Sequence, residues 1–177
     1  MGREIDDRYI KSISLTSLGI TVFQEGQYDE AESYYREAMT HSQALNHRVT
    51  LSLLHCYAGL LALARNQTQA ARESFQIGLA IAHESEIKSY LVYNLVGLAC
   101  VYLAENKLPL SAKLLSAASA IAASINFKME LEIAQPYEKA LATLREKMSE
   151  TDFIAAQKAG AKMTSTEAVQ CVQENQN

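Results

Sequence analysis

Histidines and cysteines are the residues of this chain best suited to metal binding or nucleophilic chemistry, but they are scattered. His55 and Cys56 are adjacent, and Cys100 follows on a later helical segment. A zinc site needs three or four ligands that converge on one point, which this spacing does not supply. His55 stands forty residues from both Leu15 and Leu95, so a buried, hydrogen-bonded histidine is the better interpretation. We predict no metal site and no cofactor.

Acidic residues form two clusters that could support acid–base chemistry if they shared a cleft. They are YDEAE at 28–32 and MELE at 129–132. On a helix such clusters are typical of a solvated face, or of first-turn charges that favour the helix dipole. No histidine has a serine, cysteine or carboxylate near it in the pattern of a catalytic relay. The sequence therefore predicts no catalytic residues, and a chain that is not an enzyme.

Length and composition favour a single helical domain. The chain has 177 residues, 49% of them hydrophobic, with 7 glycines, 2 prolines and no tryptophan. A net charge of −4 and a pI near 5.6 argue against direct nucleic-acid binding, which usually needs a basic surface. The 3 cysteines do not form a disulfide framework, and neither a signal peptide nor a membrane-spanning run is visible. We expect a soluble, reduced, cytoplasmic protein without membrane contact.

Small and large side chains recur along the chain every 40 residues. Gly26, Asn66 and Asn106 stand at this spacing. Each unit is predicted to be two antiparallel helices that cannot bury their apolar stripes alone, which is the signature of a helical repeat. Small residues would let the backbones approach, and a large residue would fill the space beside the next pair. The other columns with this period are Gly19, Gly59 and Ala99; Ala31, Ala71 and Ser111; Tyr35, Phe75 and Leu115; Ala38, Gly78 and Ala118; and Phe23, Leu63 and Leu103.

The predicted domain covers residues 1–177, with three helix pairs followed by C-terminal helices. The pairs are expected over 7–45, 47–84 and 87–125, and the C-terminal helices over 129–175. Asn46 suits a left-handed helix end, and Thr68 suits an N-cap. Pro136 is expected to kink or restart the helix over 129–148. Two capping patterns, SETD at 149–152 and TSTE at 164–167, predict the starts of two shorter helices.

The first unit resembles a known repeat family. The stretch LGITVFQEGQYDEAESYYREAM (18–39) is similar to a tetratricopeptide repeat (TPR), with Leu18, Gly19, Gly26, Tyr28, Ala31, Tyr35 and Ala38 at the positions of that motif. The period exceeds the usual value of about 34 residues, and resembles the longer repeats of large bacterial ATPase regulators of the LuxR (MalT-like) and AfsR types. The stretches GLACVYLAENKLPLSAKLLSAASAI (97–121), YEKALATLREKM (137–148) and FIAAQKAGAKMTSTEAV (153–169) resemble the region that closes such regulators. The resemblance implies an all-α, right-handed TPR-like superhelix with a C-terminal helical cap.

Two hallmarks of those regulators are not visible in this sequence. It has no G-x-x-x-x-G-K-[ST] phosphate loop, and no basic helix-turn-helix follows the C-terminal stretches. Either the chain is a C-terminal portion of a larger regulator, or it is a free-standing module. The resemblance implies a sensor or partner-docking role for the repeats, without the ATPase or DNA-reading activities.

In a stack of this type the first helix of each pair lines the concave side, where we expect function. Clamping an acidic peptide C-terminus would need Lys, Arg and Asn there, but the positions are apolar, so no such clamp is predicted. An exposed apolar strip of this size should bind something. Two alternatives stay open, because the C-terminal helices or a second copy of the chain could fill the strip. Its predicted members are Ile13, Thr16, Ile20, Phe23, Leu53, Cys56, Leu60, Leu63, Tyr93, Val96, Cys100 and Leu103.

The sequence therefore predicts a non-catalytic interaction module of a bacterial signalling ATPase or transcriptional regulator. Its partner would be a protein or peptide whose helix or loop docks against Phe23, Leu60 and Leu103. A homodimer is a further expectation, because solenoid ends without strongly polar caps associate.

The alternative function is a sensor domain for a small effector or a peptide. Such a domain needs a pocket with a few convergent polar groups. The candidates for those groups are Thr16, Tyr93 and Asn94.

Overall fold

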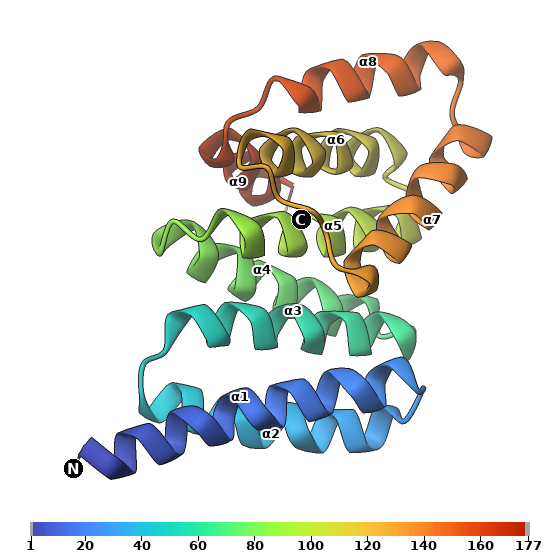
Figure 1. The fold of residues 1–177 in the computed structure, drawn as a ribbon. Coiled ribbons are helices and arrows are strands. Elements are labelled where there is room, and N and C mark those ends of the chain that lie inside the picture. Colours follow the sequence, from blue (N-terminus) through green and yellow to red (C-terminus); the bar gives the residue numbers. More distant parts are fainter. Residues whose placement is uncertain (1, 176–177) are drawn as a thin grey trace.

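The computed structural model describes residues 2–175, with side chains described from Ile5 onward, and every regular element in this range is an α-helix (Figure 1). The first six helices are α1 (Gly2–Gln24), α2 (Tyr28–Ala44), α3 (Arg48–Ala64), α4 (Thr68–Glu84), α5 (Lys88–Ala104) and α6 (Leu108–Ser124). They are followed by α7 (Leu131–Lys147), α8 (Glu150–Ala161) and α9 (Ser165–Glu174). The predicted all-α class is confirmed.

Helices α1 to α6 all end in the same way, at intervals of 20 residues. Two residues beyond the end of each helix lies a residue with positive φ. The amide of the residue after it donates to the carbonyl five residues earlier, as Ile87 N does to Ala82 O at 2.8 Å. This pattern is the Schellman ending, which requires a left-handed residue. Glycine and asparagine adopt that conformation most easily, so Glu86, with φ of 56°, is the unexpected member. The left-handed residues are Gly26, Asn46, Asn66, Glu86, Asn106 and Asn126.

Two helix starts differ from the predicted ones, and a proline expected to interrupt a helix lies within one. α1 begins at Gly2 instead of near residue 7, because the residues between are mostly good helix formers and contain no proline. Thr68 is the first residue of α4 and not its N-cap, since the Schellman turn at Asn66 leaves only Gln67 outside the helix. Pro136 lies inside a continuous α7 and does not restart it.

Both predicted capping patterns open a helix. Ser149 Oγ accepts a hydrogen bond from the Asp152 amide at 3.1 Å at the start of α8. Thr164 and Glu167 form a reciprocal capping box at the start of α9, in which each side chain accepts from the other residue's amide. The shorter Asp152 side chain bonds the Ser149 hydroxyl instead.

The columns of small and large side chains meet in space inside the first and second helix pairs. A Cβ added to Gly59 would lie 2.6 Å from the Phe75 ring, far inside van der Waals contact. The ring therefore occupies space that only a glycine leaves open. Where the large residue is smaller than an aromatic ring, the opposite position holds alanine. The two pairs in contact are Gly19 with Tyr35 and Gly59 with Phe75, and the repeat register places Ala99 and Leu115 at the same positions of the third pair.

A buried hydrogen bond also recurs with the 40-residue period. Ser12 Oγ donates to Ala38 O at 3.2 Å in the first pair, and Ser52 Oγ donates to Gly78 O at 2.8 Å in the second. Both serines are almost fully buried, so each hydroxyl is satisfied by a carbonyl of the opposite helix. In the third pair the same position holds Val92, which is buried without a polar group.

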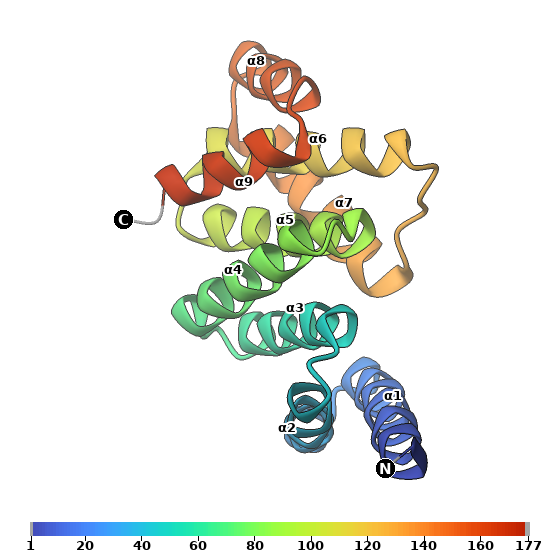
Figure 2. The ribbon, with the colours of Figure 1, turned by 90° about the vertical axis from the view of Figure 1, so that its left-hand side faces the viewer.

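The pairs stack in two layers, with α1, α3 and α5 in one and α2, α4 and α6 in the other (Figures 1 and 2). Helices of the first layer contact one another, and we call the surface they turn away from the second layer the inner face. α8 continues the stack by packing on α6. Gly160 allows this close approach, because a Cβ there would collide with the Lys113 carbonyl oxygen. α7 leaves the stack and packs chiefly on α5. The architecture is thus a helical repeat whose C-terminal part departs from the regular stacking at α7.

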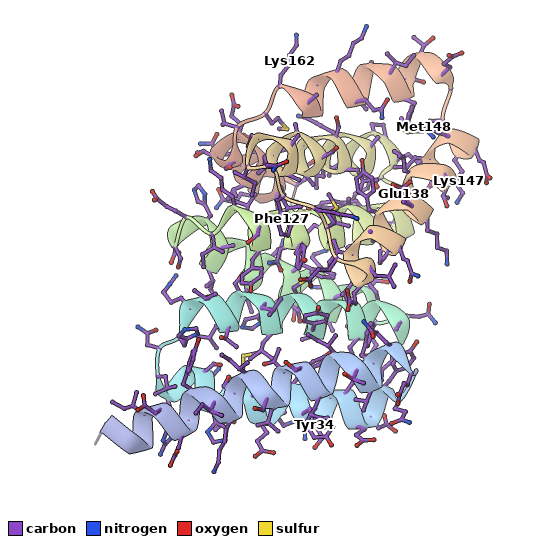
Figure 3. All side chains as sticks on the ribbon, in the orientation of Figure 1. Tyr34, Phe127, Glu138, Lys147, Met148 and Lys162 are labelled. Carbon is purple, nitrogen blue, oxygen red and sulfur yellow. The ribbon has the colours of Figure 1, made fainter. Side chains whose placement is uncertain are left out.

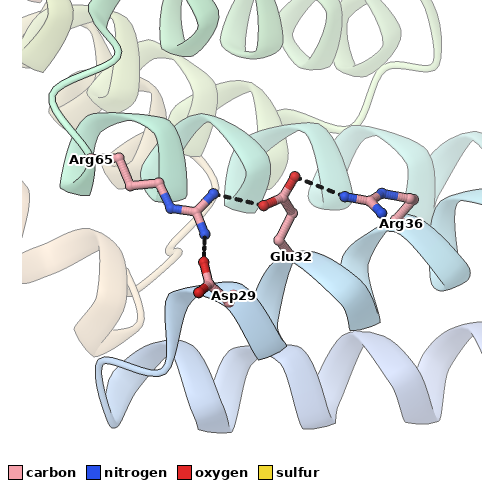
Figure 4. Close-up of polar contacts among 4 residues, drawn as sticks. All are labelled: Asp29, Glu32, Arg36 and Arg65. Atoms are coloured by element: carbon pink, nitrogen blue, oxygen red, sulfur yellow. Dashed lines mark hydrogen bonds and ion pairs between the residues drawn. The ribbon is translucent and has the colours of Figure 1, made fainter.

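Ion pairs, which we call clasps, link the first helix pair to the second and the second to the third. Arg65 at the end of α3 bonds Glu32 on α2 at 2.7 Å and Asp29 at 2.5 Å (Figure 4). Forty residues on, Arg72 on α4 bonds Glu105 at the end of α5. The two clasps occupy equivalent positions with the charges reversed. Bonding to Arg65 lowers the pKa of Glu32, and for Glu105 the pairing with Arg72 lowers the pKa in spite of burial.

The outermost stripe of α1 is mostly polar, whereas the equivalent stripes of α3 and α5 are mostly apolar. On α3 and α5 the stripe packs against the preceding helix pair and is largely buried. A polar outer stripe is what terminal repeats of a solenoid present to water. The stripe reads Lys11, Ser14, Leu18 and Thr21 on α1; Leu51, Leu54, Ala58 and Leu61 on α3; and Leu91, Asn94, Leu98 and Val101 on α5.

Candidate functional site

The predicted apolar strip does not form one open surface. Thr16, Cys56 and Val96 share one repeat position and are buried in all three pairs, with at most 4% exposed, which places this column in the core. Leu60 and Tyr93 are also buried. Ile13 is exposed, with 40% of its surface reaching solvent. The remaining members are half-buried against the core: Ile20, Phe23, Leu53, Leu63, Cys100 and Leu103.

The link between α6 and α7 covers the inner face of the third helix pair. Its Phe127 ring lies 5.6 Å from the Tyr93 ring, and Figure 3 shows Phe127 where the link crosses α5. The Glu130 amide donates to the Tyr93 hydroxyl at 3.4 Å. Burial raises the pKa of that hydroxyl, with a smaller contribution from the nearby Glu130 carboxylate. Tyr93 is therefore a packing residue beneath the link.

α7 extends this cover along the inner face. The Cys100 thiol donates to the Pro136 carbonyl oxygen at 3.8 Å, and the Gln24 side chain donates to Glu132. The first turn of α7 thus reaches the end of α1, while its middle lies on α5. The sequence had left open whether the C-terminal helices or a second copy would fill the strip. Over the third pair, the chain's own link and α7 fill it.

The inner face remains open over the first half of α1. Ile10 is 60% exposed and Ile13 is 40% exposed. In the third pair the equivalent positions hold Tyr90 and Tyr93, whose rings lie 5.9 Å apart in a tilted arrangement, with Phe127 of the link against Tyr93. Leu53, the equivalent residue of the second pair, is half-buried. We call Ile10, Ile13 and Leu53 the open patch.

The cysteines that could have done chemistry are packing residues, and His55 is half-buried. Cys56 is fully buried, and burial raises the pKa of its thiol far above the usual range. Burial also raises the pKa of Cys100 to about 12, which leaves a poor nucleophile. Burial lowers the pKa of His55, which favours its neutral form. Among the described residues, no group of three histidine, cysteine or acidic side chains is placed to hold a metal ion.

The three polar candidates for an effector pocket do not converge. Thr16 Oγ1 donates to Ser12 O in its own helix at 2.7 Å. Asn94 is fully buried beneath α4, where its amide donates to Tyr90 O at 2.8 Å and a Cβ on Gly78 would collide with it. With Tyr93 beneath the link, all three serve packing between or within helices.

A second surface feature was missed by sequence reasoning. A shallow groove of about 400 Å³ runs between α2 and α4, on the side of the stack away from the inner face, with α3 as its floor. Tyr35, Met39, Ala58, Leu61 and Ala62 supply its apolar surface. The 40-residue register could have located it, since position 62 holds alanine where position 102 holds tyrosine.

The chain matches no family model, no curated protein and no solved structure. Within the described range, none of the helices combines the length and the apolar character that crossing a membrane requires.

Proposed function

We propose that this chain is a non-catalytic module that binds a protein partner at the open patch. One observation supports the proposal. In the third helix pair the chain's own link covers apolar positions of the inner face. In the first helix pair the equivalent residues, Ile10 and Ile13, are exposed to solvent. Exposed apolar side chains grouped on a scaffold mark interaction surfaces more often than isolated ones do.

The partner chemistry follows from the cover that the chain supplies to itself. Over α5 the cover is an aromatic side chain on an extended link, followed by a helix. A partner helix or peptide that presents apolar side chains would cover the open patch in the same manner. Because about half of each isoleucine is exposed, burying Ile10 and Ile13 would contribute about 2–3 kcal/mol to binding.

We further propose that the stack is a TPR-like right-handed superhelix from a bacterial signalling ATPase or transcriptional regulator. The 40-residue recurrence of helix ends and the matched residue sizes support this reading. A cytoplasmic setting fits the cysteines, since Cys56, Cys100 and Cys171 are free thiols and disulfides are rare in that compartment.

The test compares capture of partners from the native lysate by two variants of the tagged chain. Ile13→Glu places a charge in the open patch, and Ser14→Glu places the same charge on the adjacent polar stripe of α1. We expect Ile13→Glu to lose a protein that the wild type and Ser14→Glu both capture, with the far-UV circular dichroism of all three unchanged. Equal capture by both variants would remove the open patch from the proposal.

A further inference from the structure

The groove between α4 and α6 is already occupied by a helix of this chain. α9 packs against α4, α5 and α6, as Figure 2 shows, and buries Ala168, Val169, Cys171 and Val172. The Tyr102 hydroxyl on the groove floor donates to Asn175 O at 3.4 Å. A groove between two helices of the second layer is thus filled by an amphipathic helix of 10 residues.

The groove between α2 and α4 is the same groove one repeat earlier. Its floor residues Ala58, Leu61 and Ala62 stand 40 residues before Leu98, Val101 and Tyr102. α4 forms one wall of each, so the empty groove is continuous with the interface that α9 occupies. Within the described residues its lining comes from α2, α3, α4 and the α3–α4 connection, and α9 is seated on the other side of α4.

The two floors differ in depth, and the difference defines the occupant. At the floor position that contacts the α9 end, the occupied groove carries Tyr102, whereas the empty groove carries Ala62. α9 meets the raised floor with small side chains, the largest being valine. Close packing in the deeper groove requires larger apolar side chains on the incoming helix.

We propose that the groove between α2 and α4 binds an amphipathic helix of a partner protein whose apolar face carries leucine-sized residues. The proposal rests on the proposed function, in that it takes the chain to be a protein-binding scaffold. It adds a second site on the opposite side of the stack from the open patch, together with the class of helix that fits it.

The test titrates two synthetic peptides into the ¹⁵N-labelled full chain. One has the sequence of residues 163–175, and the other carries Ala168→Leu and Cys171→Leu on the same sequence. Since each buried methylene changes an affinity about fourfold, the enlarged peptide should bind at least about tenfold more tightly. Saturable shifts are expected at the amides of Ala58, Leu61 and Ala62.

A floor variant distinguishes the groove from other surfaces. Ala62→Tyr installs the residue that position 102 already carries, so the fold has a precedent for it, whereas Ala123→Tyr adds the same ring to an exposed part of α6. Ala62→Tyr should abolish the preference for the enlarged peptide and Ala123→Tyr should keep it. Equal affinity of both peptides, shifts confined to α6 and α9, no saturable shift, or binding that survives Ala62→Tyr would each overturn the proposal. None of these outcomes bears on capture through Ile13, so the proposed function stands or falls separately.

Discussion

The matched sizes of Gly59 and Phe75 predict a coupled pair of mutations. A Cβ at position 59 would lie 2.6, 2.7 and 2.8 Å from three atoms of the Phe75 ring. Overpacking of this kind costs about 1–3 kcal/mol, whereas alanine in place of glycine inside a helix recovers about 1 kcal/mol. Gly59→Ala alone should therefore destabilise the chain by up to about 2 kcal/mol.

Phe75→Leu should relieve the collision, because the third helix pair already combines alanine and leucine at these positions. Alone, Phe75→Leu should cost about 1 kcal/mol through lost packing. Together the two changes should be less destabilising than the sum of the single changes. The expected coupling free energy is about 1–3 kcal/mol, the whole of the overpacking cost.

Urea unfolding followed by circular dichroism measures the four free energies of unfolding needed for this cycle. Each kcal/mol also corresponds to about 2–4 °C in Tm for a chain of this length. A control cycle pairs Phe75→Leu with Gly160→Ala, whose added Cβ would meet α6 instead of Phe75. The control should be additive within about 0.5 kcal/mol. Additivity of Gly59→Ala with Phe75→Leu would refute the matched-size reasoning for this fold.

Three further predictions concern the clasp, one helix end and the buried histidine. Glu32→Arg or Arg65→Glu alone should cost no more than about 1 kcal/mol, because 44% of the Glu32 side chain is exposed and solvent screens the pair. The double swap restores one arginine–glutamate pair in the charge order of the next clasp, but it also sets a carboxylate at position 65 beside Asp29, so it should recover only part of the loss in urea unfolding; a loss equal to the sum of the singles would contradict it. Glu86→Asn should raise the free energy of unfolding by about 0.5–1 kcal/mol, since asparagine tolerates the left-handed φ, and an unchanged urea midpoint would count against strain there. Burial lowers the pKa of His55 below its ordinary value of 6.5, so the unfolded chain binds the proton first and stability should fall as pH drops through and below 6.5. His55→Gln should flatten that fall, and an identical pH dependence in both proteins would rule His55 out as its source.

The repeating part of this protein could be predicted from the sequence alone because its determinants are local or periodic. A left-handed turn residue such as Asn46 specifies where a helix stops, whatever lies elsewhere in the chain. Side-chain sizes at fixed spacing specify which helices approach closely, as Gly59 and Phe75 do. The all-α class, the 40-residue period and the caps at Ser149 and Thr164 all follow from such signals.

The site could not be predicted in the same way, because its exposure depends on where non-repeating segments settle. The apolar residues within 127–147 must be buried somewhere, but only the folded chain shows that they pack over α5. That packing buries Tyr93, which would otherwise lie on the surface. Only the folded chain likewise seats α9 in one outer groove and leaves the equivalent groove over Ala62 empty. Burial is a property of contacts between distant segments, so sequence order determined the stack and tertiary packing decided which of its surfaces are free.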